Sequence, residues 1–175
     1  MTPSLRHAFV LTLAFAFAGP GAHTAAQAQT TVTTGLTADT SQPIEVESDQ
    51  LAVDQKAGTA VFSGNVRVKQ GELRITAPEA TLRYNEDRSE IETVNLTGGV
   101  TMTNGVEVVQ GQEAVYTVAT GIVVLTGDVL VTQGASTIAG PKLTYNLESG
   151  SGVMDGGRVQ SVFVPGSGAG SDAKE

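Results

Sequence analysis

The residues best suited to chemistry in this sequence are three carboxylates, Glu45, Glu47 and Asp49, which stand at alternate positions. In an extended strand this spacing places all three side chains on one face. Carboxylates gathered on one face can bind a divalent cation or serve as an acid/base pair. No further ligand converges on them in the sequence, and acidic residues on an edge strand discourage unwanted strand pairing. We therefore predict a solvated strand face, with no metal site and no catalytic site.

The residues most often used for general-base, nucleophilic and transition-metal chemistry are nearly absent. The chain has no cysteine, and its two histidines, His7 and His23, lie in the predicted leader described below. An enzyme that acts on polysaccharides through Glu45 and Glu47 is one alternative. Such an enzyme needs aromatic residues against its sugars, and the chain has no Trp and three Tyr. The sequence thus predicts a protein that is not an enzyme and that uses no cofactor.

Residues 1–28 have the organisation of a secretory signal peptide. Arg6 and His7 give a basic start, residues 8–19 are almost entirely apolar, and Ala26-Gln27-Ala28 supplies the small residues of a cleavage site. The apolar run is shorter than the about 20 residues that a membrane-spanning helix requires. We predict export, cleavage near Ala28 and a mature protein in the periplasm.

The composition narrows the choice of partners and of stabilising forces. The chain carries 18 acidic and 10 basic residues, a net charge of −8 at pH 7, without a cluster of Lys and Arg to offset it. Phosphate backbones repel such a chain, so nucleic acid is not expected as a partner. Because there is no cysteine, the fold must be stabilised by packing and by hydrogen bonds within sheets.

The dominant pattern between residues 43 and 165 is the alternation of apolar and polar residues. Ile44 and Val46 alternate with Glu45 and Glu47, and the same two-residue period appears over residues 66–69 and 72–75. Such alternation is typical of β-strands with one buried face. Runs with the apolar spacing of a helix are missing, and β-branched residues and glycine are abundant. The sequence therefore predicts an all-β fold.

The alternating region also contains an internal repeat, in three copies that begin at Gly64, Gly98 and Gly127. In each copy apolar residues follow at the second and fourth positions, a polar pair at the fifth and sixth, and glycine at the seventh. We interpret the glycines as turn residues and each unit as a hairpin, since Gln-Gly and Asn-Gly tolerate tight turns. One unit cannot bury its apolar face alone, so units must stack. This predicts stacked short antiparallel strands in an elongated two-sheet β-sandwich of jelly-roll type, or a β-solenoid, with unpaired strand edges at both ends.

The alternation places a mostly valine set of side chains inside. This set comprises Ile44, Val46, Val66, Val68, Leu73, Ile75, Val100, Met102, Val129 and Val131. Either these residues fill a dry core, as in a structural or adhesive β-solenoid protein, or small residues in register leave a groove for an apolar ligand between the sheets. Periodicity alone does not choose between the two.

Several motifs, in the same order, resemble the OstA-like family of periplasmic lipopolysaccharide-transport proteins, to which LptA belongs. They are PIEVESDQ (43–50), VFSGNV (61–66), VVLTGD (123–128), IAGPKLTY (138–145) and VQSVFVP (159–165). The resemblance covers about residues 43 to 165 and is weaker over 85–110. It defines a domain at 43–165, between a Thr-rich segment at 29–42, predicted to be a flexible lead-in, and a Gly/Ser-rich tail at 166–175, predicted to be disordered.

The resemblance implies an open β-jelly roll that binds the acyl chains of lipopolysaccharide (its lipid A part) in an apolar interior. It implies partners like LptC at the inner membrane and LptD at the outer membrane, and a head-to-tail homo-oligomer joined by edge strands. A cleavable leader favours the soluble bridge protein over the membrane-anchored LptC type. By motif, the lipid-binding positions are Ile44 and Val46 at the entrance, and Tyr116 and Val118 in the body. Repeat and alternation add Val66, Val68, Met102, Val129 and Val131.

Overall fold

The computed structural model describes residues 30–33 and 36–165. The predicted signal peptide and the predicted disordered tail lie outside the described residues. The chain forms one antiparallel sheet in the order β1-β10-β9-β8-β7-β6-β5-β4-β2, with β3 also on β4 and β11 also on β9. Its elements are β1 (Thr30–Thr33), β2 (Glu45–Glu47), β3 (Gln50–Asp54), β4 (Thr59–Gln70), β5 (Leu73–Tyr84), β6 (Ile91–Thr103), β7 (Glu107–Thr117), the 3-10 helix η1 (Val118–Thr120), β8 (Ile122–Gln133), β9 (Ser136–Asn146), β10 (Ser151–Asp155) and β11 (Gln160–Val162).

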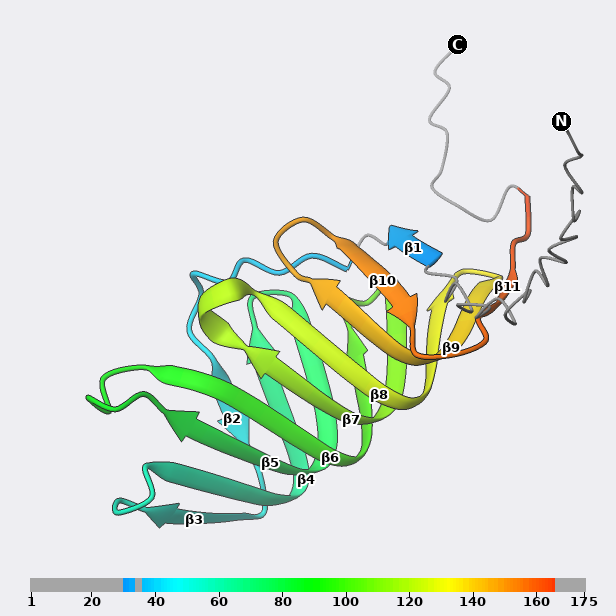
Figure 1. The fold of residues 1–175 in the computed structure, drawn as a ribbon. Coiled ribbons are helices and arrows are strands. Elements are labelled where there is room, and N and C mark those ends of the chain that lie inside the picture. Colours follow the sequence, from blue (N-terminus) through cyan, green and yellow to red (C-terminus); the bar gives the residue numbers. More distant parts are fainter. Residues whose placement is uncertain (1–29, 34–35, 166–175) are drawn as a thin grey trace, which may run out of the picture.

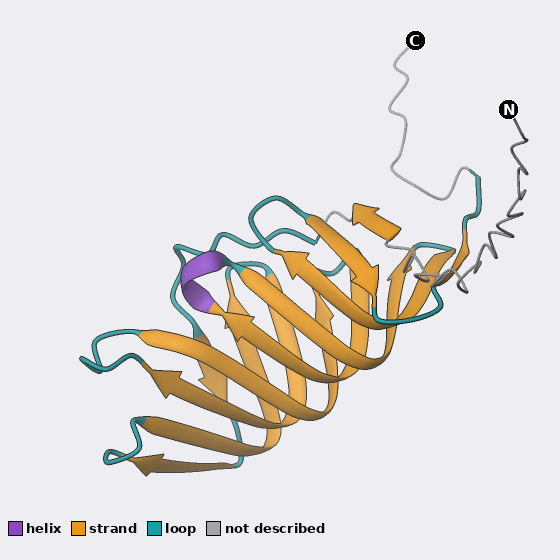
Figure 2. Cartoon of the chain, in the orientation of Figure 1, coloured by secondary structure: helices purple, strands orange, loops and turns teal. Residues whose placement is uncertain are grey.

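The predicted fold class, an all-β open jelly roll, is confirmed. Consecutive strands pair in antiparallel fashion, as in a meander, whereas the coils of a β-solenoid stack parallel strands. The repeat was compatible with a two-sheet β-sandwich and with a β-solenoid, and the β-solenoid is therefore wrong. Figure 2 shows strands almost throughout, with η1 as a single short turn of helix that connects β7 and β8. Within the described part of the chain, no helix is long and apolar enough to cross a membrane.

Strands β4 to β9 are longer than the expected short ones, because each continues through a bend near its middle. In β4, β6 and β8 the pairing register shifts at the first glycine of each repeat. Gly64 and Asn65 there have φ angles of 79° and 49°, and Gly127 and Asp128 have 80° and 50°. Two successive residues with positive φ form a bulge that turns the strand. The interpretation of these first glycines as turn residues is thus wrong, whereas Gly71, Gly105 and Gly134 do occupy the hairpin turns.

The bends fold the single sheet into two facing halves (Figure 1). The β2 half-sheet contains β2, β11, the second halves of β4, β6 and β8, and the first halves of β5, β7 and β9. The β3 half-sheet contains β3, β10, β1 and the remaining halves. Each pair of residues in the strand register lies within one half-sheet, and no pair crosses the bends. The side opposite the bends, where the hairpin turns of both half-sheets form two rims, is the mouth of the fold.

The segment predicted as a flexible lead-in is built into the fold. Thr30–Thr33 forms β1, which pairs with β10 at one end of the sheet. Leu36 is fully buried in the core, and the backbone N–H of Ala38 donates to the carbonyl of Leu147. The chain then runs along the mouth to β2 at the opposite end (Figure 1). The described part of this segment thus lies along the free edge of β10 and against the apolar interior, whereas its flexibility stays a prediction.

Candidate functional site

The inner face of the β2 half-sheet carries a continuous apolar row that crosses seven strands. Its members, each directly opposite the next in the strand register, are Val46, Val68, Ile75, Met102, Val109, Val131 and Ile138. We call this set the aliphatic row. Neighbouring strands lie about 4.8 Å apart, so six steps span about 29 Å. Four of the predicted lipid-binding residues belong to this row, which the alternation placed correctly on the inner face.

The inner face of the β3 half-sheet carries a second row, which we call the tyrosine row. Its members are Ala60, Leu82, Val94, Tyr116, Val123 and Tyr145, again in register from strand to strand. Tyr116 and Tyr145 are the largest fully buried side chains in the described structure. Small and large residues thus alternate irregularly here, whereas the aliphatic row is nearly uniform in size.

The two rows belong to one packed cluster. The predicted residues Val66, Val68, Met102, Tyr116, Val129 and Val131 are each no more than 3% exposed. Neighbouring protein atoms therefore cover almost all of their surface. The structure therefore brings the predicted site residues together, and it holds the interior between the half-sheets shut. Ile44, Val46 and Val118 differ, because they pack against the cluster while remaining partly exposed.

A cavity of about 430 Å³ lies at the mouth, near the end of the sheet that carries β2. Ile44, Tyr84, Ile91 and Val118 give it apolar walls, and Gln70 forms part of its boundary. Its volume falls in the usual range of small-ligand sites, about 300–1,000 Å³. Two predicted site residues, Ile44 and Val118, line it from opposite half-sheets. This cavity is where the apolar interior meets the surface.

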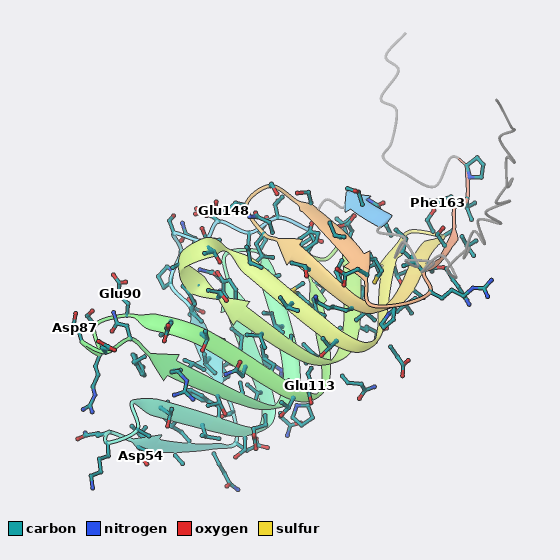
Figure 3. All side chains as sticks on the ribbon, viewed as in Figure 1. Asp54, Asp87, Glu90, Glu113, Glu148 and Phe163 are labelled. Carbon is teal, nitrogen blue, oxygen red and sulfur yellow. The ribbon has the colours of Figure 1, made fainter. Side chains whose placement is uncertain are left out.

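The two rims of the mouth carry polar residues in different settings. In Figure 3 the labelled side chains of Asp54, at the end of β3, and of Asp87, Glu90 and Glu148, on turns, lie at the rim of the β3 half-sheet. The inner side of the β2 rim instead carries the two polar residues that are buried in the described structure, Gln70 and Glu107.

Gln70 links three parts of the molecule. Its Nε2 donates to the carbonyl oxygens of Thr40 and Gln42, each at 3.0 Å, and its Oε1 accepts from the Tyr116 hydroxyl at 3.0 Å. Burial raises the pKa of Tyr116, an effect that the bond to Gln70 opposes and the nearby charge of Glu148 reinforces. The hydroxyl therefore stays protonated as a donor at neutral pH. Sequence reasoning took Gln70 as a turn residue, although its position two residues after Val68 marks it as inward-facing.

Glu107 is fully buried, and neither carboxylate oxygen has a hydrogen-bond partner among the described residues. It begins β7, with Val109 two residues further along on the same inner face. A buried carboxylate without a partner is costly, because it has lost its water and gained nothing in exchange. Sequence reasoning missed this residue as well, and the alternation of Glu107 with Val109 is the signal that would have found it.

The acidic residues at β2 contact neighbouring residues of the sheet. Glu45 forms an ion pair with Lys69 at 3.3 Å, and Glu47 lies opposite Arg67 in the register. Asp49 accepts a hydrogen bond of 2.8 Å from the Asn65 side chain. Among residues 30–33 and 36–165, no group of three or more His, Cys, Asp or Glu side chains is arranged to hold a metal ion.

Comparison with known proteins identifies related chains. Residues 45–151, more than half of the chain, match the family model described as LptA/(LptD N-terminal domain) LPS transport protein. An uncharacterized protein of Rhizobium meliloti (strain 1021) is 30% identical over 128 residues, which cover 66% of this chain and 69% of that protein.

Two named relatives match over shorter stretches. The lipopolysaccharide export system protein LptH of Pseudomonas aeruginosa is 38% identical over 63 residues, 36% of this chain and 35% of LptH. LptA of Escherichia coli (strain K12) is 43% identical over 47 residues, 27% of this chain and 25% of LptA. These matches therefore span about a third and a quarter of the two relatives.

The fold also matches a solved structure. The crystal structure of LptH, described as the LptA homologous periplasmic component of the conserved lipopolysaccharide transport device from Pseudomonas aeruginosa, superimposes with a TM-score of 0.61 at 26% sequence identity. The match covers 73% of this chain and 99% of that one. The likeness thus extends over nearly the whole of the solved jelly roll.

Proposed function

The chain belongs to the family of LptA/(LptD N-terminal domain) LPS transport proteins, and from this premise we propose that it is a periplasmic bridge protein. It binds lipopolysaccharide and passes it from the inner membrane toward the outer membrane. The named relatives are lipopolysaccharide export proteins, and the solved LptH is a periplasmic component of such a device. The leader-like residues 1–28 agree with export of this chain to the same compartment.

The observation that carries the proposal is the aliphatic row. An acyl chain exposed to water costs about 0.8 kcal/mol per CH₂ group, so a chain of about a dozen carbons costs on the order of 10 kcal/mol. A wall of uninterrupted aliphatic side chains about 29 Å long shields such a chain along its whole length. Because the row offers no polar group to grip the lipid, the lipid can move along it at nearly constant free energy.

The predicted lipid-binding residues fall into two groups under this proposal. Ile44 and Val118 at the mouth, together with Val46 on the edge strand β2, contact the lipid first, since they are partly exposed. Val66, Val68, Met102, Tyr116, Val129 and Val131 contact the acyl chains once the half-sheets have moved apart. Lipid then replaces the contacts that the two half-sheets make with each other in the closed protein.

We test the binding site by photo-crosslinking to lipopolysaccharide from adjacent residues on opposite faces. A photoreactive residue at Val68 faces the interior, and one at Arg67 faces outward on the same strand. Ile44 and Glu45 form a second such pair at the mouth. We expect labelling from Val68 and Ile44 that is at least about tenfold above their outward neighbours. Equal labelling from both faces would falsify the interior site.

The free strand edges support assembly of several copies in a row. β2 and β3 lie at one end of the sheet, and β1 and β11 at the other. Leu51 and Val53 on β3, and Val162 with Phe163 after it, expose apolar side chains at these ends. Strand addition between unlike ends joins copies head to tail, and LptC-like and LptD-like domains at the two membranes extend the row by the same pairing.

Assembly is tested by size measured against protein concentration. We expect the wild-type protein to grow in size as its concentration rises, and Val162→Pro to stop the growth by removing a backbone N–H donor from β11. Assembly that persists unchanged in the Val162→Pro protein would count against pairing through β11.

A further inference from the structure

The mouth of the fold is crossed by the chain's own N-terminal segment, residues 36–44, which we call the strap. At one end it follows β1, which belongs to the β3 half-sheet. At the other end it leads into β2, which belongs to the β2 half-sheet. The strap therefore ties one half-sheet to the other on the side opposite the bends. Leu36 is fully buried, and Ala38 and Ile44 pack against the core.

Polar bonds hold the strap to both rims. On the β3 side, Ala38 N donates to Leu147 O and Thr40 Oγ1 donates to Glu148 Oε1, both at 3.0 Å. On the β2 side, Gln70 donates to the carbonyl oxygens of Thr40 and Gln42. Gln70 also accepts from Tyr116 of the β3 half-sheet. One side chain thus joins the strap and both half-sheets at a single point, where the cavity at the mouth begins.

Resting on the proposed function, we propose that the strap is a built-in latch, which must release the β3 rim before a lipid acyl chain can enter between the half-sheets. Gln70 is its central residue. The ladder hydrogen bonds of the sheet run within each half-sheet, so separating the rims breaks none of them. In the closed protein, packed side chains, the buried Leu36 and the strap fill the volume that an acyl chain occupies once it has entered between the half-sheets.

Two features favour release of the latch. Glu107, buried and unpartnered at the β2 rim, regains water when the mouth opens, and this lowers the cost of opening. The strap also holds slack, because the side chain of Asp39 accepts hydrogen bonds from Ser41 and Gln42 in a turn, and Gln42 N donates to Asp39 O. Once the bonds of Ala38 and Thr40 to the β3 rim have broken, straightening this turn lengthens the strap, so the rims can part while β1 and β2 stay paired in their half-sheets.

The absence of cysteine allows a disulfide staple to test the latch. A Cβ at Gly121, on the β3 rim, would lie 3.4 Å from Thr40 Cγ2, and a Cβ at Gly71, on the β2 rim, would lie 3.7 Å from Gln42 Cγ. Both separations are within reach of a disulfide after small shifts. Both glycines have similar positive φ, 65° and 59°, so the two cysteine pairs carry the same backbone strain.

The Thr40→Cys/Gly121→Cys staple fixes the strap to the β3 rim and so holds the mouth closed. The Gln42→Cys/Gly71→Cys staple fixes the strap only to the half-sheet into which it already continues. With purified lipopolysaccharide as the probe, we expect oxidation to weaken binding by about tenfold or more in the first variant and by less than about threefold in the second. Reduction should restore binding in the first variant.

The outcomes separate the latch from the proposed function. If neither the wild-type nor the reduced variants bind lipopolysaccharide, the proposed function fails, and the latch fails with it. If all forms bind equally, including the oxidised Thr40–Gly121 staple, the function stands and the latch is overturned. Equal loss of binding from both staples would likewise overturn release from the β3 rim.

Two measurements keep the test decisive if a staple impairs folding. In the wild-type protein, lipopolysaccharide should reduce the hydrogen-exchange protection of the Ala38 amide, and unchanged protection in the bound protein contradicts the latch. Gln70→Ala should speed lipopolysaccharide association by about tenfold. Gln133→Ala, at the equivalent repeat position but exposed, should leave the association rate unchanged. Equal rates for the two variants contradict the role of Gln70.

Discussion

The two half-sheets face each other across the same interior, yet they are built differently. The aliphatic row of the β2 half-sheet has seven side chains of similar size, whereas the tyrosine row runs from Ala60 to the two buried tyrosines. The wall formed by the aliphatic row is therefore suited to a sliding lipid, and the wall formed by the tyrosine row to closing the interior. A uniform wall gives a long hydrocarbon no preferred resting place, whereas large residues at intervals fill the space when no lipid is present. The following predictions separate these two roles.

The largest effect is expected where the tyrosine row fills the interior. Tyr145→Ala removes a fully buried ring and should lower the free energy of unfolding by about 3–5 kcal/mol, because the remaining side chains cannot close the gap. In the aliphatic row, Ile75→Val should cost only about 0.5–1.5 kcal/mol. Urea denaturation measures both. A loss for Tyr145→Ala no larger than that for Ile75→Val would show that the Tyr145 ring does not fill the interior.

A matched pair of valines tests which wall the lipid follows. Val131 in the aliphatic row and Val123 in the tyrosine row are both buried, and Val→Thr at either position adds one unpartnered hydroxyl of nearly the same shape. Each should cost about 1–3 kcal/mol of stability. We expect lipopolysaccharide binding, measured by titration, to weaken more for Val131→Thr than for Val123→Thr. A stronger loss at Val123 would reverse the assignment of the two walls.

Gln70 and Glu107, the two inward-facing polar residues of the β2 rim, are exceptions on an otherwise apolar inner face. We expect that Glu107 can be replaced by an apolar residue without loss of stability. Glu107→Met replaces a buried, unpartnered carboxylate with an apolar side chain of similar length. The free energy of unfolding should rise by about 1–3 kcal/mol, since the penalty of the unsatisfied group disappears. Thermal or urea denaturation gives the result, with the exposed Glu113 replaced in the same way as the control. A loss of stability in Glu107→Met would mean that the carboxylate has a partner in solution.

The smallest effect concerns pH and the strap between the half-sheets. Hydrogen bonds from Ser41 and Gln42 hold the pKa of Asp39 below its ordinary value. A carboxyl group with a lowered folded-state pKa stabilises the fold above the unfolded pKa of about 3.9, and this contribution is lost as the pH falls through the folded value. The amide of Ser41 should therefore lose exchange protection in strong acid. Asp39→Asn should remove this pH dependence, and a dependence that persists would place its origin elsewhere.

The alternation of apolar and polar residues correctly predicted which side chains face inward, because the face on which a strand residue lies depends only on its position in that alternation. This is why Val66, Val68, Met102, Val129 and Val131 were placed on the inner face without any knowledge of their partners. Gly64 was misread, because a bend glycine and a turn glycine both need positive φ. What separates them is whether the neighbouring strand continues past them, which is a property of the whole sheet.

The order of residues 36–44 was not predictable for a related reason. This Thr-rich segment has neither charge pattern nor periodicity, and its structure comes from partners more than 100 residues away, Leu147 and Glu148. The closure of the interior also escaped prediction. Alternation shows which residues face inward, but the distance between the two walls depends on how the tyrosines of one row pack against the other.

The proposed binding of lipid between the half-sheets requires the two half-sheets to move apart. Because the chain lacks cysteine, spin labels can be placed at the exposed positions Ala119, on the β3 rim, and Ala135, on the β2 rim, and their separation measured by pulsed electron resonance. We expect the Ala119–Ala135 distance to lengthen when lipopolysaccharide is added. The Val106–Ala135 distance, within one rim, should stay the same. Binding of lipopolysaccharide with both distances unchanged would contradict the account.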